Sequence, residues 1–475
     1  TAFIIMSAHI TSNRRLDVAF IHPDLGIGGA ERLVVDAAMA IKNMKNDSGK
    51  ENVVKVLTSH CDPNHCFEEV RNGELKVYVY GDFLPTNLFG MFSIVFAFLR
   101  QLYLVLLLIF TGKLNNYDVI FVDQLAYCIP LLHFYKRPEA KIIFYCHFPD
   151  KLLASHHGVL RSLYRYVFDG IEEWTTRSAD IIVVNSEFTK QTVLKQFKSI
   201  AKEKRPLNVV YPCVPSRVDI DERSISRVSS FFGKSSFFLS VNRFERKKHI
   251  ELAIDSYDLY LKSEGADTKE RLVISGGYDE RVSENKTYLE DLKSKCENLG
   301  LSYAITSLAL EEDELGDSQV IFMPSIATDL KNALLSRTDL LMYTPSYEHF
   351  GIVPVEAMRM GKLVLADNTG GPLETVVNYS SNKDSYTGFT VKADAQEWSK
   401  TLFFVKSLPE TELKIASNRC VARAESTFSF SAMQKALARA IDASEPKVYH
   451  HEKVAPYFAI SFVTLLVAVG IIMKS

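Results

Sequence analysis

Several residue types are scarce or balanced in this chain of 475 residues. The seven cysteines are an odd number, which is not typical of a disulfide framework and favours a reducing compartment. Neither sign of charge is in excess, because 55 Lys and Arg stand against 57 Asp and Glu, so composition gives no reason to expect nucleic-acid binding. Only 22 glycines and 16 prolines are present, and together with 24% charged residues this excludes collagen-like, coiled-coil and disordered chains.

Length and hydrophobic content are what the chain does have. With 475 residues, 47% of them hydrophobic, it is long enough for two or three domains, since single cores stop growing near about 250–300 residues. Residues 1–16 are expected to be a leader. Arg14 and Arg15 follow its apolar stretch, which is not the order of a signal peptide.

Two long apolar runs point to a membrane. Residues 454–473 carry no charge and are long enough to span the hydrocarbon core, so we predict a transmembrane anchor there. Residues 89–110 are interrupted by a few small or polar residues, which fall on one arc of a helix: Gly90, Ser93, Ala97, Arg100 and Gln101. We predict a helix in the membrane interface with this arc turned to the protein. A core helix of a soluble domain is the alternative.

Short apolar runs separated by helical or irregular segments predict two parallel α/β sheets. The first series covers residues 17–22, 53–58, 119–123, 141–146, 181–185 and 208–211, and the second covers 237–241, 272–275, 318–323, 340–344 and 363–367. These series predict two Rossmann-like domains over 17–214 and 236–427, with a linker over 215–235 and a C-terminal helix over 428–446. Because such sheets bind ligands at the carboxyl ends of their strands, both domains are expected to line a cleft.

A glycine turn follows the first predicted strand and precedes a helical pattern. Gly28 and Gly29 belong to this turn, which lacks the full spacing of a dinucleotide fingerprint. The turn is either a tight structural connection or a loop whose backbone N–H groups face a phosphate or a sugar.

Four cations occupy six residues directly after the first strand of the second series. They run from Arg243 to Lys248. Their position at a strand's carboxyl end favours a pyrophosphate site over a solvated basic turn.

Two carboxylates, Glu348 and Glu356, lie eight residues apart after the predicted strand 340–344. Glu348 is expected in a loop, and Glu356 in the first turn of a helix over 354–360. Such a pair is suited to recognising sugar hydroxyls or to acid/base chemistry.

Histidines and cysteines give weaker signals. His147 ends a predicted strand, where a histidine is either structural or an active-site residue. Two histidines and two cysteines also occur within seven residues, namely His60, Cys61, His65 and Cys66. Zinc sites use wider, paired spacings, so we predict no metal site there.

These motifs together resemble those of retaining GT-B glycosyltransferases of family 4. Glu348 to Glu356 resembles the family's E-x7-E motif, and Arg243 with Lys248 is similar to its diphosphate clamp. Seven further segments resemble the branch of bifunctional α-1,3/α-1,6-mannosyltransferases of the dolichol-linked oligosaccharide pathway: residues 22–32, 58–62, 80–86, 145–150, 210–213, 276–282 and 347–354. The resemblance runs from about Asp17 to about Gly388.

The resemblance implies a donor site in the second domain. Arg243 and Lys248 would bind the diphosphate of GDP-mannose, and Glu356 would bind the ribose. Glu348, with the backbone of Phe350 and Gly351, would orient the transferred sugar.

The remaining positions carried over from the family come from glycine turns and from the first domain. Gly276 and Gly277 would let the chain pass close to the nucleotide. His147 would lie beside the sugar, and Gly28 and Gly29 would line the phosphate side.

The implied activity is transfer of mannose from GDP-mannose to Man1GlcNAc2-diphosphodolichol, giving an α-1,3 and an α-1,6 linkage without metal or other cofactor. The implied location is the endoplasmic reticulum membrane, with both domains on the cytoplasmic face. The lipid bilayer and other glycosyltransferases of the pathway are candidate partners. The alternatives are a family 4 enzyme with another donor or acceptor, and an inactive tail-anchored scaffold.

Overall fold

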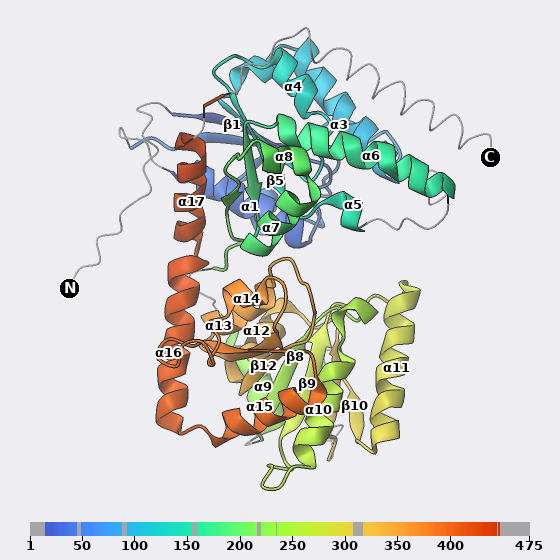
Figure 1. The fold of residues 1–475 in the computed structure, drawn as a ribbon, viewed down its shortest axis with the longest axis vertical. Helices are drawn as coiled ribbons and strands as arrows, with labels where there is room; N and C mark the ends of the chain where they lie inside the picture. The colour runs from blue at the N-terminus through green and yellow to red at the C-terminus, as the bar shows by residue number, and fades with distance from the viewer. Residues whose placement is uncertain are drawn as a thin grey trace. The chain divides into compact units, whose positions relative to one another are not determined.

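The computed structural model describes residues 15–44, 49–87, 93–153, 159–215, 220–233, 235–306, 317–443 and 445–446 (Figure 1). The chain divides into two compact units. Unit 1 consists of Thr1–Cys213 and Phe430–Ser475, and unit 2 consists of Val214–Ser429. The predicted anchor at 454–473 and most of the predicted leader lie outside the described residues.

The core of unit 1 is a parallel sheet in the order β3-β2-β1-β4-β5-β6-β7. Its strands are β1 (Asp17–His22), β2 (Val53–Thr58), β3 (Lys76–Val79), β4 (Val119–Asp123), β5 (Lys141–Cys146), β6 (Ile181–Val184) and β7 (Asn208–Val209). The strand order reverses between β1 and β4, which pair directly. The central strands are buried along most of their length, as a parallel sheet covered on both faces requires.

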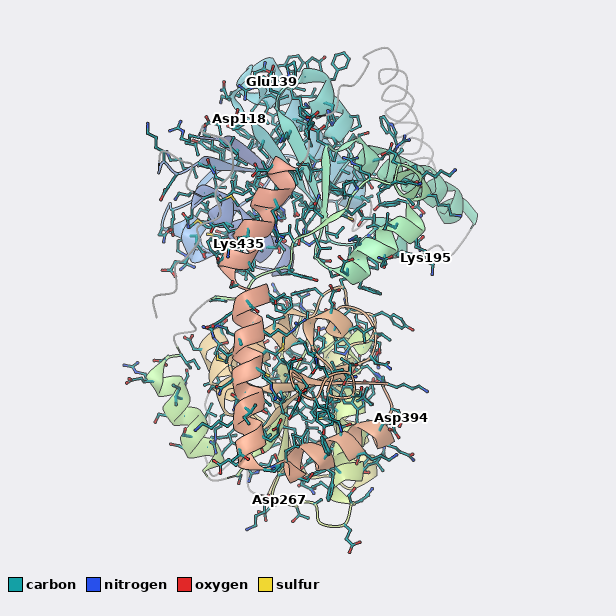
Figure 2. All side chains as sticks on the ribbon, turned by 60° about the vertical axis from the view of Figure 1, so that its left-hand side comes forward. Asp118, Glu139, Lys195, Asp267, Asp394 and Lys435 are labelled. Atoms are coloured by element: carbon teal, nitrogen blue, oxygen red, sulfur yellow. The ribbon has the colours of Figure 1, made fainter. Side chains whose placement is uncertain are left out.

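Helices connect these strands and cover the sheet. They are α1 (Gly29–Lys42), α2 (Glu68–Arg71), α3 (Ser93–Phe110), α4 (Ile129–Tyr135), α5 (Asp150–Leu153), α6 (Val159–Ser178), α7 (Glu187–Gln196) and α8 (Lys198–Lys202), with the 3-10 turn η1 (Lys113–Asn116). The C-terminal helix α17 (Phe430–Asp442) also belongs to this unit and packs beside α1 (Figure 1). Figure 2 labels Lys435 on this helix. Lys141 Nζ donates to the carbonyl of Ile441 at 2.6 Å, which fixes the end of α17 to the sheet.

Helix α3 turns its charged residue inward, as predicted. Arg100 is 5% exposed and donates to the carbonyl of Ser59 at 3.1 Å and to Asp82 Oδ1 at 2.9 Å. Gln101 is also buried and donates to the carbonyl of Leu125 at 2.9 Å. Ser93 is exposed, so only part of the predicted arc faces the protein.

By length and composition α3 could cross a membrane, and one third of it is buried in the protein. Its place in the chain argues against a single crossing. Strand β1 pairs with β2, which precedes α3, and with β4, which follows it. A single crossing by α3 would put β1 and β4 on opposite sides of the bilayer, although the two strands are hydrogen-bonded to each other. The backbone groups that pair in the sheet would then lose their partners.

Unit 2 repeats the architecture with a parallel sheet in the order β10-β11-β9-β8-β12-β13-β14. The strands are β8 (Phe237–Val241), β9 (Arg271–Gly276), β10 (Tyr303–Ile305), β11 (Val320–Pro324), β12 (Leu340–Tyr343), β13 (Leu363–Asp367) and β14 (Gly388–Val391). The helices are α9 (Glu222–Phe232), α10 (Glu251–Leu261), α11 (Ser283–Leu299), α12 (Thr328–Arg337), α13 (Ile352–Arg359), α14 (Pro372–Thr375), α15 (Ala395–Ser407) and α16 (Glu410–Thr427), with the 3-10 turn η2 (Arg246–Lys248). Here the strand order reverses between β8 and β12.

The sheets confirm the prediction of two parallel α/β units and add elements that the sequence did not reveal. Helix α9 occupies much of the segment 215–235, which was predicted only as a linker, and it buries Val228, Phe231 and Phe232. Helix α13 begins at Ile352, two residues before the predicted start.

Candidate active site

The reversal of strand order in unit 2 marks a candidate site. Ligands of open parallel sheets bind outside the carboxyl ends of the strands, at the point where the order reverses. In unit 2 that point lies between β8 and β12. Lys248 follows β8 and Glu348 follows β12, and the Lys248 ammonium donates to Glu348 Oε2 at 2.5 Å. Thr344 donates its hydroxyl to the carbonyl of Lys248 at 2.6 Å, which ties the two loops together.

The charge of Glu348 depends on this pair. Burial alone would raise the pKa of Glu348, but the Lys248 ammonium outweighs burial, and the pKa lies below its ordinary value. Glu348 is therefore ionised at neutral pH. Behind it, burial and the neighbouring Glu348 carboxylate raise the pKa of Tyr343, whose hydroxyl stays protonated.

The loop that carries Glu348 is held in an unusual conformation. Tyr347 has a φ of +54°, in the left-handed region that non-glycine residues seldom adopt. Its backbone N–H donates to Thr369 Oγ1 at 2.8 Å, and the N–H of Gly371 donates to the carbonyl of Glu348 at 2.7 Å. A Cβ at Gly370 would lie 2.4 Å from that same carbonyl oxygen. The turn after β13 therefore needs glycine to support the Glu348 loop.

Arg243 and the predicted glycines lie at the ends of β8 and β9. The Arg243 side chain is 65% exposed, and its guanidinium lies 3.8 Å from Glu245. Gly276 has a φ of +148°, and a Cβ there would lie 1.9 Å from the carbonyl oxygen of Asn242. Gly277 follows, and a Cβ there would lie 3.3 Å from the Arg243 side chain. The backbones at the ends of β8 and β9 are therefore in direct contact, and the exposed Arg243 guanidinium lies beside them.

Glu356 is held by a residue that the sequence analysis missed. Because α13 begins earlier than predicted, Glu356 lies in its second turn and not in the first. Both of its carboxylate oxygens accept from Lys331 on α12, at 2.8 and 2.9 Å. Gly351 precedes α13 with a φ of +81°, and the Phe350 side chain beside it is 5% exposed.

The first-unit residues lie at the corresponding edge of the other sheet. His22, Asp123 and His147 end or follow the neighbouring strands β1, β4 and β5. Asp123 Oδ2 lies 2.9 Å from His22 Nδ1, and its Oδ1 lies 2.8 Å from His147 Nε2. Of these three residues, only His147 was predicted as a site residue. An aspartate at the end of a buried strand was the available signal for Asp123.

His22 and Asp123 carry opposite charges in this cluster. Burial alone would lower the pKa of His22, but the hydrogen bond to Asp123 and the nearby carboxylate of Glu31 overcome burial and raise the pKa to about 9. Burial alone would raise the pKa of Asp123, but His147 and His22 lower it to about 2. A buried imidazolium therefore accompanies a buried carboxylate at neutral pH.

The predicted glycine turn leads into this cluster. Glu31 lies in the first turn of α1, and its Oε1 is 3.8 Å from His22 Nε2. A Cβ at Gly28 would lie 2.2 Å from Glu31 Oε2, so glycine leaves room for this carboxylate. Gly29 begins α1 and has open space where a Cβ would stand.

The other histidine and cysteine group makes local contacts. His60 Nδ1 lies 2.8 Å from Asp82, and the Cys66 thiol donates to the carbonyl of Pro63. No cluster of three or more metal-ligating side chains occurs among the residues that the structure describes.

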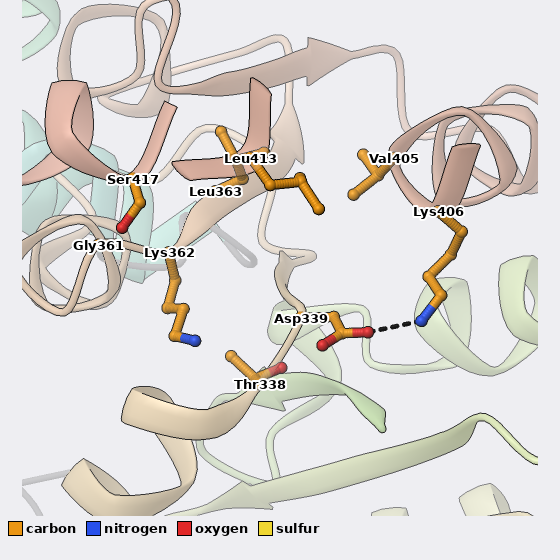
Figure 3. A pocket seen from close by; sticks show the side chains of 9 residues that line it. All are labelled: Thr338, Asp339, Gly361, Lys362, Leu363, Val405, Lys406, Leu413 and Ser417. Atoms are coloured by element: carbon orange, nitrogen blue, oxygen red, sulfur yellow. Dashed lines mark hydrogen bonds and ion pairs between the residues drawn. The ribbon is translucent and has the colours of Figure 1, made fainter. Parts of the chain in front are cut away.

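A cavity of about 260 Å³ opens at the opposite edge of the unit 2 sheet (Figure 3). Asp339 and Lys362 line it and immediately precede strands β12 and β13. Lys406 also lines the cavity and donates to Asp339 at 2.6 Å. Because this cavity lies at the amino ends of the strands, it is separate from the candidate site.

Comparison with known proteins identifies the class. Residues 27–217 match the family described as Glycosyltransferase Family 4, and residues 221–419 match Glycosyl transferases group 1. Among solved structures, sucrose-phosphate synthase from Thermosynechococcus elongatus has a TM-score of 0.64 at 17% identity, covering 90% of this chain and 99% of that one. Anabaena HepE in complex with UDP and glucose has a TM-score of 0.61 at 18% identity, covering 90% and 100%. The fold and the site define a GT-B glycosyltransferase.

Relatives of higher identity narrow the class to one family. The alpha-1,3/1,6-mannosyltransferase ALG2 of Candida albicans is 50% identical over 84% of this chain and 93% of its own length. ALG2 of Saccharomyces cerevisiae is 44% identical over 94% of this chain and 88% of its own length. ALG2 of Schizosaccharomyces pombe is 44% identical over 84% and 75%. The chain belongs to the ALG2 family of alpha-1,3/1,6-mannosyltransferases.

Proposed function

We propose that this mannosyltransferase uses GDP-mannose as donor and Man1GlcNAc2-diphosphodolichol as acceptor, and adds one α-1,3 and one α-1,6 mannose. The observation that carries the proposal is the pair of Lys248 and Glu348 at the reversal point of unit 2. It joins a cation suited to a diphosphate with a carboxylate suited to sugar hydroxyls. Membership of a family of alpha-1,3/1,6-mannosyltransferases supports mannose as the transferred sugar.

In this proposal the protein supplies the charges that bind the donor diphosphate. Arg243 is exposed beside the β8 end, and Lys248 needs only to exchange part of its contact with Glu348 for a phosphate oxygen. Charge-assisted bonds from these two cations stabilise the negative charge that grows on the leaving diphosphate. Glu356 binds the ribose, and the backbone of Phe350 and Gly351 helps Glu348 to orient the mannose. Transfer then needs no metal.

The proposed reaction keeps the anomeric configuration. The bond between the mannose C1 and the β-phosphate oxygen breaks, and a bond from C1 to an acceptor hydroxyl oxygen forms on the same face of the ring. The hydroxyl proton passes to the leaving phosphate oxygen, so no protein nucleophile takes part. Glu348 orients the sugar, and His147 lies beside it from unit 1.

A location at the endoplasmic reticulum membrane fits the acceptor, which never leaves the bilayer. Helix α3 offers a contact surface, because Phe96, Tyr103, Leu107 and Phe110 form one outward stripe at helical spacing. Phe110 is 83% exposed at the end of this stripe. The seven cysteines are all free thiols, which supports the cytoplasmic face.

The test is transfer by the purified full-length protein in detergent or vesicles. A lipid-diphosphate acceptor bearing Man1GlcNAc2 is incubated with GDP-mannose and analysed by mass spectrometry. We expect a gain of two hexoses, with linkage-specific mannosidases reporting one α-1,3 and one α-1,6 bond. A gain of one hexose would reject the double addition and keep the donor.

Donor choice is tested in the same assay with UDP-glucose or UDP-mannose in place of GDP-mannose. Equal transfer from a UDP sugar would reject GDP-mannose as the specific donor. No transfer from any donor, together with normal binding of GDP, would point to another acceptor. Loss of both transfer and nucleotide binding in a folded protein would favour an inactive scaffold.

A further inference from the structure

We propose that Asp123 and His22 are positioning residues, which hold the His147 ring so that its Nδ1 is the atom offered to the substrate. The inference rests on the proposed place of His147 beside the transferred sugar and extends it to two residues that do not touch the substrate. It assigns a purpose to a buried cluster at the carboxyl edge of unit 1.

Asp123 and His147 are in direct contact. Asp123 is fully buried and ionised, so its Oδ1 accepts a hydrogen bond and cannot donate one. His147 Nε2, 2.8 Å away, must therefore carry the proton of this bond. The His147 ring also lies against Tyr145, with 4.9 Å between ring centroids. These two contacts fix both the tautomer and the plane of the ring.

The His147 ring is partly exposed. The His147 side chain is 24% exposed, whereas those of His22 and Asp123 are wholly buried. Since Nε2 is directed to Asp123, Nδ1 on the other side of the ring is the nitrogen available for hydrogen bonding. With the proton on Nε2, Nδ1 is the acceptor nitrogen of the ring, and it is suited to receive a hydrogen bond from a sugar or acceptor hydroxyl.

Asp123 is itself held by a second histidine, His22. Its second oxygen accepts from His22 Nδ1 at 2.9 Å, and His22 is buried under the glycine turn. His22 Nε2 has no hydrogen-bond partner among the described residues, and its nearest carboxylate is Glu31 at 3.8 Å. An imidazolium wedged between Asp123 and Glu31 keeps the aspartate ionised and directed at His147. Gly28 contributes by leaving the space that Glu31 occupies.

The position of the cluster favours orientation of His147 over a purely structural role for Asp123 and His22. β1 and β4 are the two strands between which the order of the sheet reverses, and β5 is the next strand along. Buried ion pairs are a weak source of net stability, since desolvation offsets much of their attraction. A buried charged chain that ends on a partly exposed histidine at the ligand-binding edge is better explained by orientation of that histidine.

The test is a double-mutant cycle in the full-length protein, with transfer from GDP-mannose as the readout. Asp123→Asn keeps the shape but has one oxygen for two histidines. We expect kcat to fall roughly 10- to 100-fold, the range seen when the hydrogen-bond partner that orients a metal-binding histidine is removed, with an unchanged KM for GDP-mannose. In a His147→Ala background the same change should cost nothing further, since residues that act as a unit are not additive.

A matched control is available at the other end of the same sheet. Asp180 is a buried aspartate that accepts from the backbone N–H of Ile142 at 2.6 Å and lies 3.7 Å from His133. Asp180→Asn should lower the melting temperature, and its effect on kcat should be the same with and without His147→Ala. His22→Gln provides a second variant should Asp123→Asn fail to fold, with an expected loss of roughly 10-fold that also vanishes in the His147→Ala background.

The outcomes are distinguishable. Full activity of His147→Ala would overturn both the proposed role of His147 and this inference. A His147→Ala variant with a low but measurable kcat, together with a fully active Asp123→Asn, would overturn the inference alone, as would a loss that persists undiminished in the double variant. An Asp123 effect that disappears with His147, in protein that still binds GDP, supports it.

Discussion

Lys248 and Glu348 are 100 residues apart in the sequence, and their side chains meet at 2.5 Å. The contact exists because β8 and β12 are neighbours in the sheet of unit 2 although β9, β10 and β11 lie between them in the chain. In the absence of a ligand the pair satisfies two charges that are each only about one-fifth exposed. In the proposed function, a diphosphate sugar gives both of them new partners.

Replacing Glu348 by glutamine should separate donor binding from transfer. Glu348→Gln keeps the volume but removes the negative charge, while Arg243 and Lys248 remain. We expect GDP to bind with near-normal affinity and kcat/KM for mannose transfer to fall roughly 100- to 1,000-fold. Calorimetric titration with GDP and the hexose-transfer assay measure the two effects. Wild-type transfer by this variant would remove Glu348 from the site.

Removing Arg243 should weaken the donor site without unfolding it. The side chain is 65% exposed, so Arg243→Ala should leave the melting temperature nearly unchanged. Loss of a charge-assisted contact to the diphosphate should lower kcat/KM roughly 100-fold. Arg281, 90% exposed in the same unit and paired with Asp279, is the matched control. If Arg281→Ala reduces transfer as much as Arg243→Ala, the effect is general electrostatics and not the clamp.

Two adjacent glycines should respond differently to alanine. A Cβ at Gly276 would lie 1.9 Å from the carbonyl oxygen of Asn242, and its φ of +148° excludes other residues. Gly276→Ala should therefore destabilise unit 2 by about 2 kcal/mol or more. At Gly277 the nearest atom is a flexible Arg243 carbon at 3.3 Å, so Gly277→Ala should cost far less.

The chain has two tryptophans, and one of them allows this comparison to be made on unit 2 alone. Trp398 is fully buried in α15 of unit 2. Urea unfolding followed by fluorescence in a Trp174→Phe background therefore reports on that unit. Equal unfolding midpoints for the two glycine variants would contradict the predicted difference.

The stability of unit 1 should fall at alkaline pH because of His22. Its pKa is about 9 in the folded chain against 6.5 for an ordinary histidine, so its contribution is complete below pH 6.5 and disappears as the pH rises through 9. We expect a loss of about 1 kcal/mol per pH unit in this window, and His22→Gln should flatten it. Fluorescence of Trp174 in a Trp398→Phe background follows unit 1. An unchanged pH slope in His22→Gln would contradict the imidazolium.

The outward stripe of α3 should enter the bilayer surface. Phe110→Trp places a fluorophore at the most exposed position of the stripe. In full-length protein lacking its two native tryptophans, vesicles with brominated acyl chains should quench it strongly. Phe403, 38% exposed on α15 of unit 2, gives the control variant Phe403→Trp, which should not be quenched. Equal quenching at both positions would reject a specific role for α3.

The central strands could be predicted from sequence because a strand buried on both faces is a continuous apolar run. β1, β2, β4, β5, β8 and β13 have the predicted bounds. The edge strands β3, β10 and β14 escaped prediction. β3 is largely exposed and β10 has three residues, so neither shows a buried pattern.

The candidate site divides in the same way. The motif residues could be found singly, since glycine, cations and carboxylates after strands have a recognisable chemistry. Their partners could not, because those contacts depend on strand order. Lys331 on α12 bonds Glu356 on α13, and Asp123 bonds His22, which is 101 residues away in the sequence. No local sequence pattern indicates either contact.

The chain passes from one unit to the other twice, at Val214 and at Ser429, and the backbone at these two points is paired. The backbone N–H of Val214 donates to the carbonyl of Phe428 at 2.9 Å, and Val214 forms a parallel bridge with Ser429. Unit 2 is therefore an uninterrupted insertion whose ends are paired, while unit 1 is assembled from two distant pieces. During synthesis α17 is made more than 200 residues after β7, the last strand of the unit 1 sheet, so α17 can pack on that sheet only then. Folding of the first unit is thus completed only after the second has been made.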